Sequence, residues 1–169
     1  MRKLALLVCF VFLFAVGVRA QGTVDSQWNC GKATDEHSID VGDQPGHAYA
    51  VSQAKCSAAK GEIAGVQEKE GTATEFHEVM GNKNSWHGVF VETLASGDTI
   101  HISYKGTGTV SGAQFVSGSN TWTITGGTGK VKGIKGKGAC KGKGNPDGTA
   151  TWDCEGTYEA AAAAPDKKK

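Results

Sequence analysis

Glycine and lysine dominate the stretch GGTGKVKGIKGKGACKGKG (126–144), where a phosphate-binding loop is the first chemistry to consider. Such loops need glycines spaced as G-x-G-x-x-G, or as G-x4-G-K-[ST], at the start of a helix. Here the glycines follow G-x-G-x3-G from Gly127 and again from Gly136, and neither run opens a helix-like pattern. The spacing therefore indicates glycine-rich β-structure rather than a nucleotide site.

The lysines of this stretch belong to an uneven distribution of charge. Residues 99–146 contain seven lysines and no acidic residue, whereas residues 21–98 contain twelve acidic residues and five lysines. A basic stripe can bind a phosphate backbone or an anionic surface. However, arginine is missing after residue 20, and no aromatic residues alternate with the lysines. We expect no nucleic-acid partner and interpret the lysines as an exposed strand face.

The histidines and serines do not form a recognisable metal or nucleophile motif. Five histidines, His37, His47, His77, His87 and His101, lie ten or more residues apart and form no H-x-H or H-x3-H pair. A metal site would have to be assembled across strands, by His77 with His87 or by His87 with His101. No G-x-S-x-G motif marks a serine nucleophile. We predict no metal and no cofactor.

Glu92 is the only candidate catalytic group that we can name. In SWHGVFVETL (85–94), a register that turns Trp86 and Phe90 inward would also bury Glu92, raise its pKa and suit it to acid/base chemistry. The opposite register buries Val89 and Val91 and leaves Glu92 in water. Because glutamate is seldom buried, the second register is the expected one.

The first twenty residues, MRKLALLVCFVFLFAVGVRA, have the basic start, apolar core and V-R-A end of a signal peptide cleaved after Ala20. The apolar run is too short to span a bilayer, and no later run is longer, so no transmembrane segment is expected. One domain is predicted over 21–159, with an N-terminal extension at 21–35 and a flexible tail at 160–169. The expected location is secreted or periplasmic.

Four cysteines remain after cleavage: Cys30, Cys56, Cys140 and Cys154. An even number in an exported chain indicates disulfides. The segments 133–144 and 149–160 flank the turn sequence NPDG, so they are expected to form a hairpin with Cys140 opposite Cys154. The pair Cys30–Cys56 then follows by elimination.

Glycine and β-branched residues recur after residue 20, and no long stretch has helical periodicity, so the domain is expected to be all-β. Turn signals separate the segments, among them GNKN, ASGD and SGSN. Alternation in the last hairpin places the lysines outside and glycines, with Trp152 and Tyr158, inside, as in a small barrel wall. The expected strands are 47–55, 71–79, 85–94, 99–106, 120–126, 133–144 and 149–160, with shorter ones at 37–41 and 62–67.

Three segments resemble a known family: VGDQPGHAYAVSQAKC (41–56), WHGVFVETLASGDTIHISYKGTG (86–108) and ITGGTGKVKGIKGKGACKGKGNPDGTATWDCEGTY (124–158). They are similar to exported bacterial relatives of the allene oxide cyclase and dirigent barrels. The resemblance implies an antiparallel eight-stranded barrel whose interior is filled by side chains or holds one small ligand. The plant members act on small hydrophobic molecules, but none of their active-site motifs can be matched to residues of this chain.

These observations predict an all-β protein, a single small antiparallel eight-stranded β-barrel with disulfides. The expected function is non-catalytic binding of a small apolar or aromatic ligand. The alternatives are a cyclase- or isomerase-like enzyme that uses Glu92, and a structural protein that associates with anionic surfaces through its lysine face. The oligomeric state is left open. The expected binding residues are the inward aromatic side chains Trp86, Phe90, Tyr104, Trp122, Trp152 and Tyr158.

Overall fold

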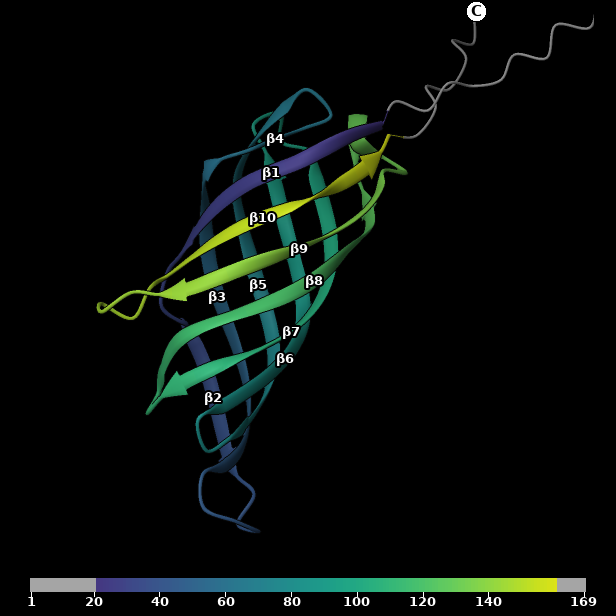
Figure 1. Cartoon of the computed structure of the whole chain (residues 1–169). Helices are drawn as coiled ribbons and strands as arrows, with labels where there is room; N and C mark the ends of the chain where they lie inside the picture. Colours follow the sequence, from purple (N-terminus) through teal and green to yellow (C-terminus); the bar gives the residue numbers. More distant parts are fainter. Residues whose placement is uncertain (1–20, 161–169) are drawn as a thin grey trace, which may run out of the picture.

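A computed structural model describes residues 21–160 of the chain (Figure 1). The predicted signal peptide at 1–20 lies outside the described residues, as do residues 161–169 of the predicted tail. No helix in the described range has the length and apolarity needed to cross a bilayer. The elements are β1 (Gln21–Cys30), β2 (Asp35–Asp40), β3 (His47–Lys60), β4 (Glu62–Ile63), β5 (Val66–Met80), β6 (Lys83–Leu94), β7 (Thr99–Ser111), β8 (Gln114–Gly127), the 3-10 turn η1 (Gly129–Val131), β9 (Lys135–Gly144) and β10 (Ala150–Glu159).

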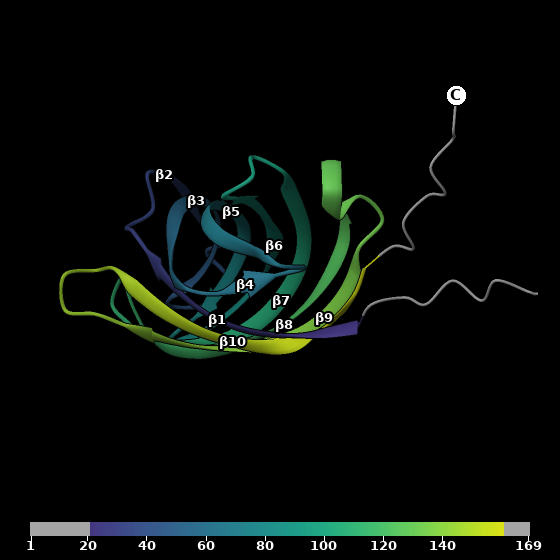
Figure 2. The ribbon, with the colours of Figure 1, turned by 90° about the horizontal axis from the view of Figure 1, so that it is seen from above.

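Eight strands close into an antiparallel barrel, which Figure 2 shows from above. Their order around the wall is β1, β10, β9, β8, β7, β6, β5 and β3, and β3 pairs back with β1. The short strands β2 and β4 pair with β3 and β5, respectively. The predicted all-β, eight-stranded barrel with two disulfides is confirmed.

The hairpin of β9 and β10 has the predicted register. Cys140 lies opposite Cys154, and the two form a disulfide. Lys135 and Lys137 are exposed, whereas the alternate positions on β9 face inward. The alternation of side chains on either side of the NPDG turn therefore predicted correctly which residues of this hairpin face inward and which face outward.

Two segments differ from expectation. The expected N-terminal extension at 21–35 contains β1, which pairs with β10 along its whole length, and Trp28 is buried in the barrel. The turn expected at SGSN (117–120) is wrong, because these residues lie within β8 and the chain turns before them, at Gly112. Gly118 serves packing instead, since a Cβ there would lie 2.7 Å from the Trp86 ring.

One end of the barrel is closed by β4 and η1. Ile63, Val131 and Ile134 are buried there in one cluster with core residues of the wall. The backbone N–H of Ala64 donates a hydrogen bond of 3.0 Å to the Tyr158 hydroxyl, which ties the β4 turn to β10. This end is therefore packed rather than hollow.

The barrel closes along a short seam between β1 and β3. Only four residue pairs join these strands, from Gln27 with Lys60 to Cys30 with Cys56. The Cys30–Cys56 disulfide lies at the end of the seam. Beyond it, β3 pairs with β2, which pairs with no further strand in the described range. The disulfide therefore holds the wall closed at the point where direct β1–β3 pairing stops.

We expect Cys30→Ala/Cys56→Ala to destabilise the fold more than Cys140→Ala/Cys154→Ala. The sequence separations are 26 and 14, so loop-closure entropy alone gives losses of about 3.5 and about 3 kcal/mol. The first pair also secures the seam, whereas β9 and β10 are paired along ten residues without their disulfide. Urea unfolding of the two double variants measures the difference. If Cys30→Ala/Cys56→Ala is at least as stable as Cys140→Ala/Cys154→Ala, the role of Cys30–Cys56 in holding the seam is contradicted.

Candidate functional site

The six aromatic residues predicted to bind a ligand all occupy inward positions of the barrel wall. Two of them support the fold: Trp122 belongs to the main core, and the Tyr158 hydroxyl is bound by Ala64. Tyr104 and Trp152 pack against the same core, while Trp86 and Phe90 contact other aromatic rings. Their role in binding stays a prediction. The inward residues are Trp86, Phe90, Tyr104, Trp122, Trp152 and Tyr158.

Aromatic rings meet across the interior from several strands. The ring centroids of Trp28 on β1 and Phe90 on β6 lie 4.9 Å apart in an edge-on arrangement. Trp86 on β6 and Trp152 on β10 are 6.0 Å apart, and Phe115 on β8 stacks on Trp152 at 5.3 Å. The aromatic side chains of β1, β6, β8 and β10 therefore meet across the interior.

The part of the interior at β3 and the first half of β5 is lined by small side chains. The inward positions of β3 are Ala48, Ala50, Ser52 and Ala54, and those at the start of β5 are Gly71 and Ala73. Ala50 and Ala54 are only half-buried although they face inward, and the same holds for Phe90 on β6 and Tyr104 on β7. Water therefore reaches this part of the interior.

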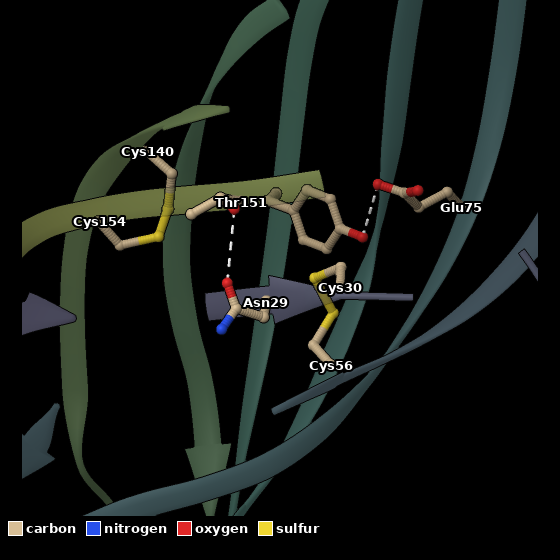
Figure 3. The surroundings of a disulfide bond; sticks show 8 residues. Asn29, Cys30, Cys56, Glu75, Cys140, Thr151 and Cys154 are labelled. Carbon is tan, nitrogen blue, oxygen red and sulfur yellow. Dashed lines mark hydrogen bonds between the residues drawn. A yellow bond between two sulfur atoms is a disulfide. The ribbon is translucent and has the colours of Figure 1, made fainter. Parts of the chain in front are cut away.

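A polar cluster lies in this space, built from inward residues of four neighbouring strands. The Tyr104 hydroxyl donates a hydrogen bond of 2.8 Å to Glu75 Oε1, drawn as the dashed line at Glu75 in Figure 3. Glu75 Oε2 lies 3.5 Å from His77 Nε2. The same nitrogen is 2.9 Å from Ser52 Oγ, while His77 Nδ1 is 3.2 Å from the Asn84 amide nitrogen. None of these polar residues was a predicted binding residue except Tyr104.

The tautomer of His77 decides what the cluster can do. The Asn84 amide N–H donates to Nδ1, so the ring proton resides on Nε2, between Ser52 and the Glu75 carboxylate. A protonated Nε2 cannot take a proton from Ser52, so Ser52 is not activated as a nucleophile. Burial and then the charge of Glu75 raise the pKa of Tyr104, which keeps it a neutral donor. The cluster is suited to hydrogen bonding a polar group.

Glu92 lies inside the barrel, which corrects the expected register of β6. Its side chain is 1% exposed, whereas Val89 and Val91 are exposed. Trp86 and Phe90 lie on the same inner face of β6. Burial of these two rings therefore fixes a register in which Glu92 also faces inward. Burial raises the pKa of Glu92 to about 9, with the nearby Glu68 charge as the second cause. Glu92 is therefore a protonated acid at neutral pH.

A second buried acid, Glu68, lies beside Glu92 on β5. Burial raises the pKa of Glu68, and the nearby Ser26 hydroxyl on β1 lowers it by a smaller amount. The two side chains do not reach hydrogen-bond geometry. Sequence reasoning missed Glu68 because a bulge between Glu68 and Glu70 breaks the alternation of β5. The two acids belong to the packed half of the interior.

The histidine pairs considered for a metal site do not form. His77 faces inward, whereas His87 lies on the outer wall and stacks on Phe76 with centroids 5.4 Å apart. His101 also lies on the outer wall, opposite Val91. Within residues 21–160, no group of three or more histidine, cysteine or acidic side chains could hold a metal ion.

The outer wall carries an open groove of about 1040 Å³ that is lined by residues of β2, β3, β5, β6, β7, β8 and β9. Exposed apolar side chains line it, among them Ile39, Tyr49, Val51 and Phe76. Most lining residues hold outward positions, but Ala50, His77 and Trp86, which face inward, also belong to the lining. We consider the interior site the better candidate because its polar groups are partly buried and bonded to one another, whereas His87 and Lys105 in the groove are exposed.

Solved structures of two pterocarpan synthase dirigent proteins are similar to this chain. GePTS1 is 10% identical over 92% of this chain and 97% of its own, with a TM-score of 0.50. PsPTS1 is 14% identical over 83% and 96%, with a TM-score of 0.49. At this identity the GePTS1 comparison shows the fold alone, a dirigent-like barrel. No family model and no curated protein matches the chain.

Proposed function

We propose that the barrel binds a small aromatic ligand in its interior, in contact with the small side chains of β3 and the rings of Trp86, Phe90 and Trp152. One observation carries this proposal: Glu75 and His77 are 20% and 16% exposed at inward positions, within a largely apolar lining. Ligand sites typically combine an apolar concave lining with a few polar groups that fix orientation. Glu75, His77 and Ser52 would supply these groups, and Trp86, Phe90 and Trp152 the apolar contacts.

Binding of N-phenyl-1-naphthylamine, a neutral aromatic dye whose emission rises in apolar surroundings, tests the location. We expect Ala50→Phe to weaken dye binding by about tenfold or more, because the new ring would fill the space beside His77. Val51→Phe is the matched control, since Val51 is the next residue on β3 and lies on the outer wall. Thermal melting checks that both variants fold, and Ala54→Leu provides a smaller inward change. Equal binding by parent and both inward variants would contradict an interior site.

An isomerase-like activity through Glu92 is the second candidate. It is favoured by the raised pKa, which leaves a proton on the carboxyl at neutral pH. It is opposed by the burial of Glu92, which a substrate would have to overcome. Docking on an anionic surface is less well supported, because the β9 lysines have acidic neighbours: Lys141 lies opposite Asp153 and Lys135 opposite Glu159.

We also propose that the protein is exported. The first twenty residues have the pattern of a signal peptide. The two disulfides support the same location, since such bonds persist in oxidising compartments.

A further inference from the structure

The ionisable side chains that face the interior of the barrel are mostly acidic. All twelve lysines between residues 21 and 160 are exposed, and this range contains no arginine. Three carboxyl groups face inward: Glu68, Glu75 and Glu92. His77 is the only inward group among the described residues that can carry a positive charge. Glu68 and Glu92 lie in the packed half of the interior and Glu92 is protonated, so the acidic group that a ligand beside His77 would meet is Glu75, with no fixed cation next to it.

One acceptor of the polar cluster, Glu75, is open to a donor, and a second, the Asn84 carbonyl oxygen, is buried without a partner. Glu75 Oε1 already accepts the Tyr104 hydroxyl, but a carboxylate has further lone pairs, and its side chain is reached by water. Asn84 is 8% exposed, and its carbonyl oxygen has no partner although its amide nitrogen contacts His77. An unsatisfied buried acceptor is costly, so a donor delivered by a ligand is favoured here. A neutral hydroxyl group would donate a weaker hydrogen bond to these acceptors than an N–H-bearing cation, and a carbonyl group could donate none.

Aromatic side chains lie next to these acceptors. Glu75 is directly opposite Gly88 on β6, and the inward neighbours of Gly88 along that strand are Trp86 and Phe90. Gly88 has no side chain to separate them from Glu75. Aromatic rings attract an ammonium group through their electron-rich faces, most strongly where water is largely excluded. The same rings offer contact area to an aromatic ligand.

We propose that the ligand class of this barrel is a primary arylalkylamine, with its ammonium group at Glu75 and Asn84 and its aromatic ring against Trp86 and Phe90. This inference rests on the interior binding function proposed above and names the ligand chemistry of the same site. It disfavours fatty acids and aromatic carboxylates, because their anionic group would lie beside Glu75 with no inward lysine or arginine to pair with.

Calorimetric titration of the oxidised, folded protein with three matched compounds tests the proposal. The compounds are 2-phenylethylamine, 2-phenylethanol and 3-phenylpropanoate, which differ mainly in the charge of the polar end. We expect the amine to bind about tenfold or more tighter than the alcohol, and the carboxylate to bind more weakly than either. Equal affinities for amine and alcohol would overturn the amine assignment and leave interior binding intact. No binding of any of the three, together with dye binding unaffected by Ala50→Phe, would overturn both.

Glu75→Gln separates the charge of Glu75 from its shape. The amide can still accept the Tyr104 hydroxyl, so the variant is expected to fold. We expect amine affinity to fall by about tenfold, and alcohol affinity to change by less than about twofold. Glu155→Gln, at an exposed position of β10, is the control and should leave both affinities unchanged. A Glu75→Gln protein that binds the amine as tightly as the parent would overturn the assignment.

Discussion

Glu92→Gln is expected to make the protein more stable above neutral pH and to reduce the pH dependence of its folding. An unfolded glutamate loses its proton near its ordinary pKa of 4.5, whereas folded Glu92 keeps it up to about 9. Between these values the folded state binds one proton more, so this contribution is complete below pH 4.5 and is lost as pH rises through the folded pKa. The slope is at most about 1.4 kcal/mol per pH unit.

Urea unfolding at pH 5, 6, 7 and 8 measures this effect. At pH 8 the variant should exceed the parent by up to about 5 kcal/mol, since glutamine fills the same space without ionising. His47, whose pKa is raised mainly by its hydrogen bond to Asp43, contributes in the same direction above pH 6.5. It is unchanged in the variant, so the difference between the two proteins isolates Glu92 and its coupling to Glu68. Glu70→Gln, at an exposed position, is the control. A parent and Glu92→Gln variant with parallel curves would show that Glu92 gains no proton on folding.

Gly138→Ala is expected to be severely destabilising. A Cβ at this inward position of β9 would lie 2.1 Å from the backbone oxygen of Glu155 and 2.3 Å from a ring carbon of Trp122. The first contact can be relieved only by separating β9 from β10, because a backbone atom cannot rotate away. Overpacking of this kind costs typically 1–3 kcal/mol, and we expect about 3 kcal/mol or more here because two hard contacts coincide.

Gly126→Ala is the matched control for Gly138→Ala. It lies in β8 with no strained backbone angle, and the atom nearest to the new Cβ would be Nδ1 of the His101 ring, 3.9 Å away. Its thermal midpoint should stay close to that of the parent. Similar melting of both variants would mean that the barrel wall relaxes easily and that the inner glycines are not required for ring packing.

The parts of the fold that depend on local signals could be predicted from the sequence. The NPDG turn fixed the β9–β10 register, and with it Cys140 opposite Cys154 and the outward lysines. Glycine had two uses that the sequence did not distinguish. Gly112 forms a turn at positive φ, whereas Gly118, in the equally turn-like SGSN, lies in a strand against Trp86. The two glycines differ in their surroundings: the Trp86 ring packs against Gly118, whereas no atom lies close to Gly112.

The candidate site depended on pairing between distant segments. Ser52 and His77 meet because β3 and β5 are neighbours in the wall, although β4 intervenes in the chain. No local spacing of serine and histidine marks this contact. Glu92 was assigned to water because burial of glutamate is rare, but Trp86 and Phe90 share its face of β6. The combined burial of those rings outweighed one carboxyl that could become neutral.

The composition of the inner wall bears on how barrels of this kind could change specificity. At Gly88 and Gly138 a new side chain would meet backbone atoms, at 2.3 and 2.1 Å, so variation there threatens the fold itself. Ala50 and Ala54 on β3 already carry a Cβ and border open space. Substitutions at these two positions would alter the shape of the interior while the strand register is preserved. Divergence toward new ligands would therefore be concentrated on one strand, and descendants of a common barrel could keep an invariant glycine framework while differing in what they hold.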